Sequence, residues 1–191
     1  ALNVLQTICS DIDGEAIIAG GAVRNWQEGR LARDIDIYLR CNLKGSGRIR
    51  ECICNLVKDK GAVSEGKDLD VGEYDLSLPM KYLISLLVDG LEFQFIVVDQ
   101  GLPSKFQDSI LESFDLGICK VGINEFGDLL ALKEYFLDKN NKTLTFYYGN
   151  MSDRHIRSAM DRHIPKVMGY YPNHKLVLNG QKTNNNFLPY V

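Results

Sequence analysis

The sequence lacks the features that mark membrane-spanning, secreted and repeat proteins. No apolar run approaches the roughly 18 residues that a membrane-spanning helix needs. The N-terminal residues place no basic patch before an apolar stretch, so we do not expect a signal peptide. Internal repeats and an obvious linker are also missing. The 191 residues, of which 45% are hydrophobic and 25% charged, predict one soluble domain of ordinary size with at most a small appendage.

Cysteine and histidine are few, and their spacing matches no common metal-binding motif. Cys52-x-Cys54 has no second pair at zinc-finger spacing, and the histidines at positions 155, 163 and 174 form no close group. The five cysteines are an odd number without the spacing of a disulfide-rich domain. We therefore expect reduced cysteines that mostly pack in the interior, and a cytoplasmic protein.

The net charge of −3 is unevenly distributed along the chain. Residues 151–191 hold six Lys and Arg against two Asp and Glu, whereas residues 1–150 hold 16 against 23. We expect a domain over 1–150 and a basic helical extension over 151–191 that packs on it. Such an extension can contact a polyanion, and Arg154, Arg157 and Arg162 are the candidate contacts. A solvated helix face is the alternative explanation of the same charges.

Hydrophobic periodicity predicts a mixed α/β domain. The clearest hairpin has two apolar runs, 82–88 and 91–98, around an Asp-Gly pair, which favours a tight turn. Other strands are expected over residues 15–19, 34–40, 118–123 and 143–148, and a loop over 61–80. Helices are expected over residues 2–9, 22–28, 46–60, 103–114, 129–137 and 153–168, the last capped by Ser152 and interrupted near Pro165.

Residues 19–38 combine several groups that suit one task, the binding of a metal-bound triphosphate. Gly20 and Gly21 end a strand and allow the backbone to turn closely around a ligand, and the following helix presents free N–H groups to an anion. Arg24, one turn into that helix, is placed to reach phosphates. Asp34 and Asp36 lie two apart and so share one face of the next strand, where Mg²⁺ would relieve their repulsion. Asp11-x-Asp13 has the same spacing, but Gly14 follows it directly and predicts a loop.

Phosphoryl-type transfer with two metal ions needs a third carboxylate. Glu92 is our candidate, because Phe93, Phe95 and Val97 face one side of their strand and Glu92 the other. An exposed strand residue paired with a lysine is the alternative. Asp89 and Asp99 are weaker candidates, because they fall at strand ends.

These motifs resemble the head domain of tRNA nucleotidyltransferases and bacterial poly(A) polymerases, within the polymerase-β-like nucleotidyltransferase superfamily. That family has Gly-Gly-x-Val-Arg-Asp, then Gly-Arg, then Asp-x-Asp, and residues 20–36 follow this order. Leu91-Glu92-Phe93 is similar to the family's hydrophobic-Glu-hydrophobic strand. Residues 114–121 resemble its Arg-Arg-Asp-Phe-Thr-Ile-Asn-Ala element, which holds the nucleotide, so Asp115 is a candidate nucleotide-binding residue. A residue that ends a helix is the alternative for Asp115. The resemblance covers roughly residues 14–130.

The sequence departs from the family at four of these positions. Asn25 replaces an aspartate, Ser113 and Phe114 replace the two arginines, and Cys119 replaces an asparagine. The long helical domains that bind tRNA in the family are absent, so we do not predict CCA addition. Small proteins of this kind also occur in large bacteriophages.

The resemblance implies a nucleotidyltransferase fold, an NTP substrate and Mg²⁺ or Mn²⁺ as cofactor. We expect Asp34, Asp36 and Glu92 to be the catalytic metal ligands, and Gly20, Gly21, Arg24 and Asp115 to hold the nucleotide. The expected reaction moves a nucleoside monophosphate to an acceptor hydroxyl, at an RNA 3′ end. The alternatives are a toxin- or antitoxin-type transferase that modifies a protein or tRNA, and an inactive nucleotide-binding regulator with the same fold.

Overall fold

The computed structural model describes residues 5–6, 9–10, 14–41, 51–55, 80–88, 90–98, 105–149 and 151–180. Their strands are β1 (Gly14–Ala19), β2 (Asp34–Cys41), β3 (Met80–Val88), β4 (Leu91–Val98), β5 (Val121–Asn124), β6 (Leu129–Ala131), β7 (Thr143–Tyr147) and β8 (Lys175–Asn179). Their α-helices are α2 (Gly21–Trp26), α4 (Phe106–Glu112), α5 (Lys133–Asn141), α6 (Asp153–Ser158) and α7 (Ile164–Tyr170), and a 3₁₀ turn, η2, spans Gly117–Cys119. None of the helices in these ranges combines the length and the hydropathy of a membrane span.

The main sheet has six strands in the order β3-β4-β2-β1-β5-β6. Its β2 and β4 strands are parallel, and its other neighbouring strands are antiparallel. Because side chains alternate along a strand, β2 contributes Ile35, Ile37 and Leu39 to one hydrophobic cluster and Tyr38 to the other. Asp34 and Asp36 therefore share the face of Tyr38, and α4 covers part of that face.

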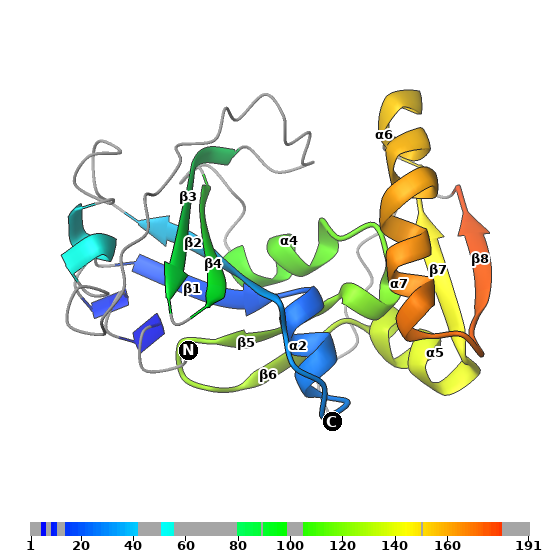
Figure 1. Ribbon diagram of the computed structural model, residues 1–191, viewed down its shortest axis with the longest axis horizontal. Helices are drawn as coiled ribbons and strands as arrows, with labels where there is room; N and C mark the ends of the chain where they lie inside the picture. Colours follow the sequence, from blue (N-terminus) through cyan, green and yellow to red (C-terminus); the bar gives the residue numbers. More distant parts are fainter. Residues whose placement is uncertain are drawn as a thin grey trace.

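A smaller unit adjoins the main sheet and consists of α5, the parallel pair β7–β8, and a long helix (Figure 1). In that helix α6 and α7 are joined by five residues of π-helix, η3 (Ala159–His163). The unit is tied to the rest by the backbone hydrogen bond from Tyr147 to Asp115 and by a bridge between Leu116 and Phe146. The mixed sheet with helices packed on it and a helical segment near the C-terminus confirms the predicted fold class.

Most of the predicted elements in the described ranges are confirmed. The strands β1, β2 and β7 lie where periodicity placed them, and β3 and β4 form the predicted antiparallel hairpin. Ser152 caps α6, its side chain accepting a hydrogen bond from the backbone N–H of His155. The interruption expected near Pro165 is the π-helical segment just before it, and the proline itself lies in the first turn of α7.

Three predictions were wrong in detail. The helix expected over 129–137 is a short strand, β6, followed by α5. The strand expected over 118–123 begins only at Val121, after η2. The strand β8 was missed, because Lys175-Leu-Val-Leu-Asn179 exposes Val177 and Leu178 and gains its strand partner only through β7. Since β7 and β8 pair across residue 150, the smaller unit takes residues from both sides of the predicted domain boundary, and that division stays a prediction.

Several other predictions lie wholly or mostly outside the described residues. These are the helix over 2–9, the helix over 46–60 except for residues 51–55, which are helical, the loop over 61–80, and the carboxylates Asp11, Asp13, Asp89 and Asp99.

Candidate active site

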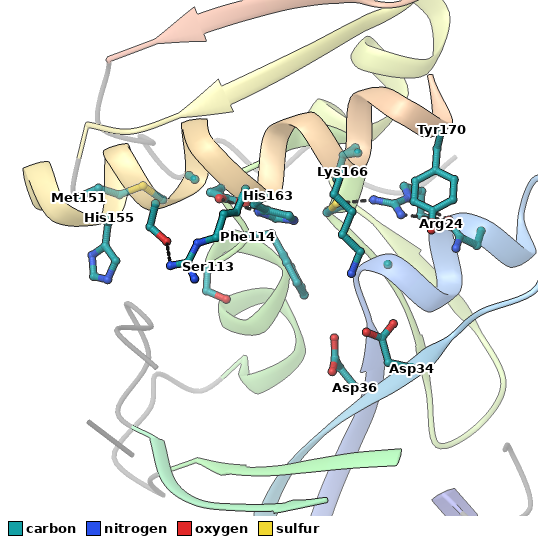
Figure 2. A pocket seen from close by; sticks show the side chains of 18 of the residues that line it. Arg24, Asp34, Asp36, Ser113, Phe114, Met151, His155, His163, Lys166 and Tyr170 are labelled. Atoms are coloured by element: carbon teal, nitrogen blue, oxygen red, sulfur yellow. Dashed lines mark hydrogen bonds and ion pairs between the residues drawn. The ribbon is translucent and has the colours of Figure 1, made fainter. Parts of the chain in front are cut away.

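A cavity of about 930 Å³ separates the carboxylate-bearing face of β2 from the long helix α6–α7. Its lining comes from five places in the sequence: the glycine turn with α2, the first residues of β2, the segment after α4, the 3₁₀ turn, and the long helix. Figure 2 shows the two walls facing each other, with the aspartates on one and basic and aromatic side chains on the other. Residues far apart in the sequence therefore meet around one space of nucleotide size.

Asp34 and Asp36 both line this cavity, as the alternation along β2 predicts. Burial, together with the neighbouring Asp34, raises the pKa of Asp36 from 3.8 to about 7. Glu92 acts in the same direction, and Lys166 opposes it. The pair is thus a partly buried carboxylate site at which a divalent cation would relieve the repulsion, which is the donor chemistry that Mg²⁺ prefers.

Glu92 lies beside the pair but is turned from it. Its backbone is in register with Asp34 in the parallel pairing of β2 and β4. Its Oε1 accepts hydrogen bonds from Ser85 Oγ at 2.7 Å and Gln94 Nε2 at 3.3 Å, and Ser85 belongs to β3, on the far side of β4. Among the described residues, no group of three or more His, Cys, Asp or Glu side chains is arranged to hold a metal ion. The role of Glu92 as third ligand therefore stays a prediction.

The glycine turn is held in a conformation and a space that require glycine. Gly20 has a φ of 79°, and a Cβ at this position would lie 2.7 Å from Cε1 of Phe114. Phe114 closes over the turn and meets Tyr38 edge to face. The helix α2 that follows has only six residues, so its dipole is short, and the attraction of the cavity for anions must come mainly from cationic side chains.

Arg24 lies at the cavity wall, but its guanidinium is already engaged. It is buried, it donates from Nε and Nη2 to Asn25 Oδ1 at 3.2 and 3.0 Å, and it donates from Nη1 to Cys119 Sγ at 3.1 Å. The rings of Tyr170 and Tyr171 flank it at 5.6 and 5.8 Å. Two positions at which the sequence departs from the family, Asn25 and Cys119, thus meet at one guanidinium. Both partners are uncharged groups, since burial raises the pKa of the Cys119 thiol.

Asp115 also lines the cavity, and its carboxylate is paired with the long helix. Its Oδ2 lies 3.2 Å from Nδ1 of His163, the last residue of the π-helical segment. Among Arg154, Arg157 and Arg162, the predicted polyanion contacts, only Arg162 belongs to the described lining of the cavity, and it donates to Ser158 Oγ at 2.7 Å. The other two lie on α6 outside the cavity.

Lys166 is the cavity residue that sequence reasoning missed. It was counted among the charges of the basic extension, but no motif distinguished it from the others. Ala159, His163, Lys166 and Tyr170 recur at the spacing of one helix face, and all four line the cavity. Periodicity groups these residues, but it does not show that their face of the helix meets Asp34 and Asp36.

Comparison with known proteins supports the same fold. No protein-family model matches the chain, and no curated protein matches it by sequence. A solved structure of a CCA-adding enzyme with ATP matches at 16% identity and a TM-score of 0.60, over 92% of this chain and 38% of that one. The Thermotoga maritima CCA-adding enzyme in complex with tRNA matches at 16% identity and a TM-score of 0.57, over 88% and 35%. A tRNA nucleotidyltransferase with a primer tRNA and an ATP analogue matches at 17% identity and a TM-score of 0.54, over 90% and 46%.

These similarities confirm that the chain has the nucleotidyltransferase fold that the motifs predicted. The chain spans less than half the length of the structures that it matches. The activity and partners of those enzymes are therefore a basis for proposals about this chain.

Proposed function

We propose that this protein is a nucleotidyltransferase that moves a nucleoside monophosphate from an NTP to an acceptor hydroxyl and releases pyrophosphate. The observation that carries the proposal is the pair Asp34 and Asp36. Both carboxylates lie on one face of β2 and line a cavity of about 930 Å³, and the opposite wall of that cavity is basic. A carboxylate pair that is costly to bury is retained where it has a ligand to bind. The fold shared with enzymes solved with ATP and tRNA supports the same reaction class.

Each residue or residue pair of the cavity has its own proposed role. Mg²⁺ or Mn²⁺, held by Asp34 and Asp36, would neutralise the triphosphate and activate the acceptor hydroxyl. Glu92 is the proposed third carboxylate, and its Oε1 accepts a hydrogen bond from Ser85. The turn at Gly20 and Gly21 lets the backbone approach the phosphates, and Arg24 keeps a fixed positive charge at the wall beside it. Asp115, paired with His163, shapes the wall that the rest of the nucleotide faces.

The proposed acceptor is an RNA 3′ end. Arg162 at the cavity, and Arg154 and Arg157 along the exposed helix α6, give the acceptor backbone a basic path toward the carboxylates. Two of the structures with this fold hold tRNA. The free cysteines at 9, 52, 54 and 119 support a cytoplasmic location as part of the same proposal.

A labelling experiment tests the proposal. The wild-type protein, with Mg²⁺, total RNA and each α-labelled NTP in turn, is expected to label an RNA. The double variant Asp34→Ala/Asp36→Ala is expected to give background labelling, and Asp161→Ala, an exposed carboxylate on the same chain, to equal the wild type. Equal labelling by the wild type and the double variant would reject the two aspartates as catalytic. Label on a protein instead of RNA would identify a protein-modifying transferase. Binding of NTP without labelling would identify an inactive regulator.

A further inference from the structure

We propose that Lys166 is the cation of a polyphosphate subsite, and that it binds the β- and γ-phosphates of the NTP from the helix that faces the aspartates. The inference rests on the proposed function, whose reaction requires a triphosphate in this cavity. It adds a residue that neither the sequence motifs nor the comparisons assign.

The position of Lys166 is the first support. It lines the cavity from α7, and its side chain extends toward Asp34 and Asp36 across the space between the two walls (Figure 2). Lys166 is exposed and makes no hydrogen bond or ion pair with any other described residue. Its ammonium is therefore directed into the cavity with all three donors available.

The other cations of the wall are less suited to this task. Arg24 is committed to Asn25 and Cys119 and is held by packing between two tyrosine rings. Arg162 already donates to Ser158. Arg33 makes no hydrogen bond or ion pair among the described residues, but it directly precedes Asp34 and so comes from the wall of the aspartates, not from the helix that faces them. Of these, Lys166 alone stands opposite the aspartates on a flexible stem, which suits a phosphate group that arrives and departs.

Phe114 and the short helix α2 supply little positive charge to a bound triphosphate, so a cationic side chain is needed. Phe114 occupies a position where the family resembled by this sequence has an arginine, and its ring packs against Gly20 and Tyr38 without supplying charge. The six residues of α2 provide only a weak dipole. On the side of the long helix Arg162 already donates to Ser158, so Lys166 is the cation with free donors that is directed at the carboxylates.

Direct binding measurements test the subsite. Isothermal titration in the presence of Mg²⁺ compares inorganic tripolyphosphate, ATP and AMP on the wild type, Lys166→Ala and Lys166→Arg. Loss of a charge-assisted contact predicts that Lys166→Ala binds tripolyphosphate and ATP about tenfold more weakly or worse. Lys166→Arg should retain most of the affinity, and AMP, which has no β- or γ-phosphate, should bind all three proteins equally. Lys175→Ala, an exposed lysine on β8, is the matched control and should bind as the wild type does.

The outcomes separate this inference from the proposed function. Equal tripolyphosphate binding by the wild type and Lys166→Ala, no binding by either, or an equal loss for AMP and ATP would overturn the subsite. Transfer activity is a separate readout. If the wild type transfers no nucleotide but binds tripolyphosphate through Lys166, the proposed function fails and the subsite stands. If transfer depends on Asp34 and Asp36 but the wild type and Lys166→Ala bind polyphosphate equally, the subsite fails and the function stands.

Discussion

Replacement of Asp36 by Asn is expected to slow nucleotidyl transfer by about 1,000-fold or more. The substitution keeps the shape of the side chain and removes its charge, so the packing beneath it is conserved. The carboxylate it removes is one of the two that β2 presents to the cavity. Loss of several kcal/mol of charge stabilisation at the reacting phosphate corresponds to a rate loss of this size.

The measurement is the initial rate of α-label transfer at saturating NTP, with circular dichroism to confirm the fold of the variant. Asp161→Asn, at an exposed position on the long helix, provides a control with the same chemical change and should keep the wild-type rate. A rate within tenfold of the wild type for Asp36→Asn would show that the reaction does not run through this carboxylate.

The same substitution is expected to stabilise the metal-free protein at neutral and alkaline pH. An isolated aspartate has a pKa of 3.8, and burial beside Asp34 raises the pKa of Asp36 to about 7 in the folded chain. Between these two values the unfolded chain has lost the proton that the folded chain keeps, and above pH 7 the folded chain must bury the charge. Stability therefore falls as pH rises from about 4 to 7, by at most about 4 kcal/mol.

Asn cannot ionise, so the variant escapes this loss. Thermal unfolding in EDTA should show an advantage of Asp36→Asn over the wild type that is large at pH 8 and small at pH 4. Added Mg²⁺ should raise the melting temperature of the wild type at pH 8 more than that of the variant, because the cation relieves the repulsion only where both carboxylates remain. An advantage equal at the two pH values would mean that Asp36 is not perturbed by its surroundings.

Local sequence patterns predicted much of the fold and one wall of the site. The alternation of Ile35 and Ile37 with Asp34 and Asp36 places both carboxylates on one face of β2 whatever packs above them. The glycine pair and the Asp-Gly hairpin are likewise short-range signals, since they follow from backbone geometry over a few residues. The strand of Glu92 was expected beside that of Asp34 and Asp36, and the pairing of β2 with β4 places Glu92 in register with Asp34.

The opposite wall could not be predicted, because it depends on contacts between distant segments. His163 and Lys166 lie on one face of the long helix, and only the packing of that helix against the rest of the chain sets this face opposite the aspartates. The contact of Arg24 with Cys119 joins residues 95 positions apart. Together with the hydrogen bonds to Asn25, it shows Arg24 as a wall charge with donors already engaged, where the sequence suggested a side chain free to reach phosphates.

The position of the transferred label tests the central claim most directly. The wild-type protein is incubated with Mg²⁺, RNA and an NTP labelled either at the α- or at the γ-phosphate. Nucleotidyl transfer beside Asp34 and Asp36 predicts that α-label enters the RNA while γ-label leaves as pyrophosphate, in equal amounts. Entry of γ-label into the acceptor, or release of γ-label as orthophosphate with no α-label transferred, would contradict the account.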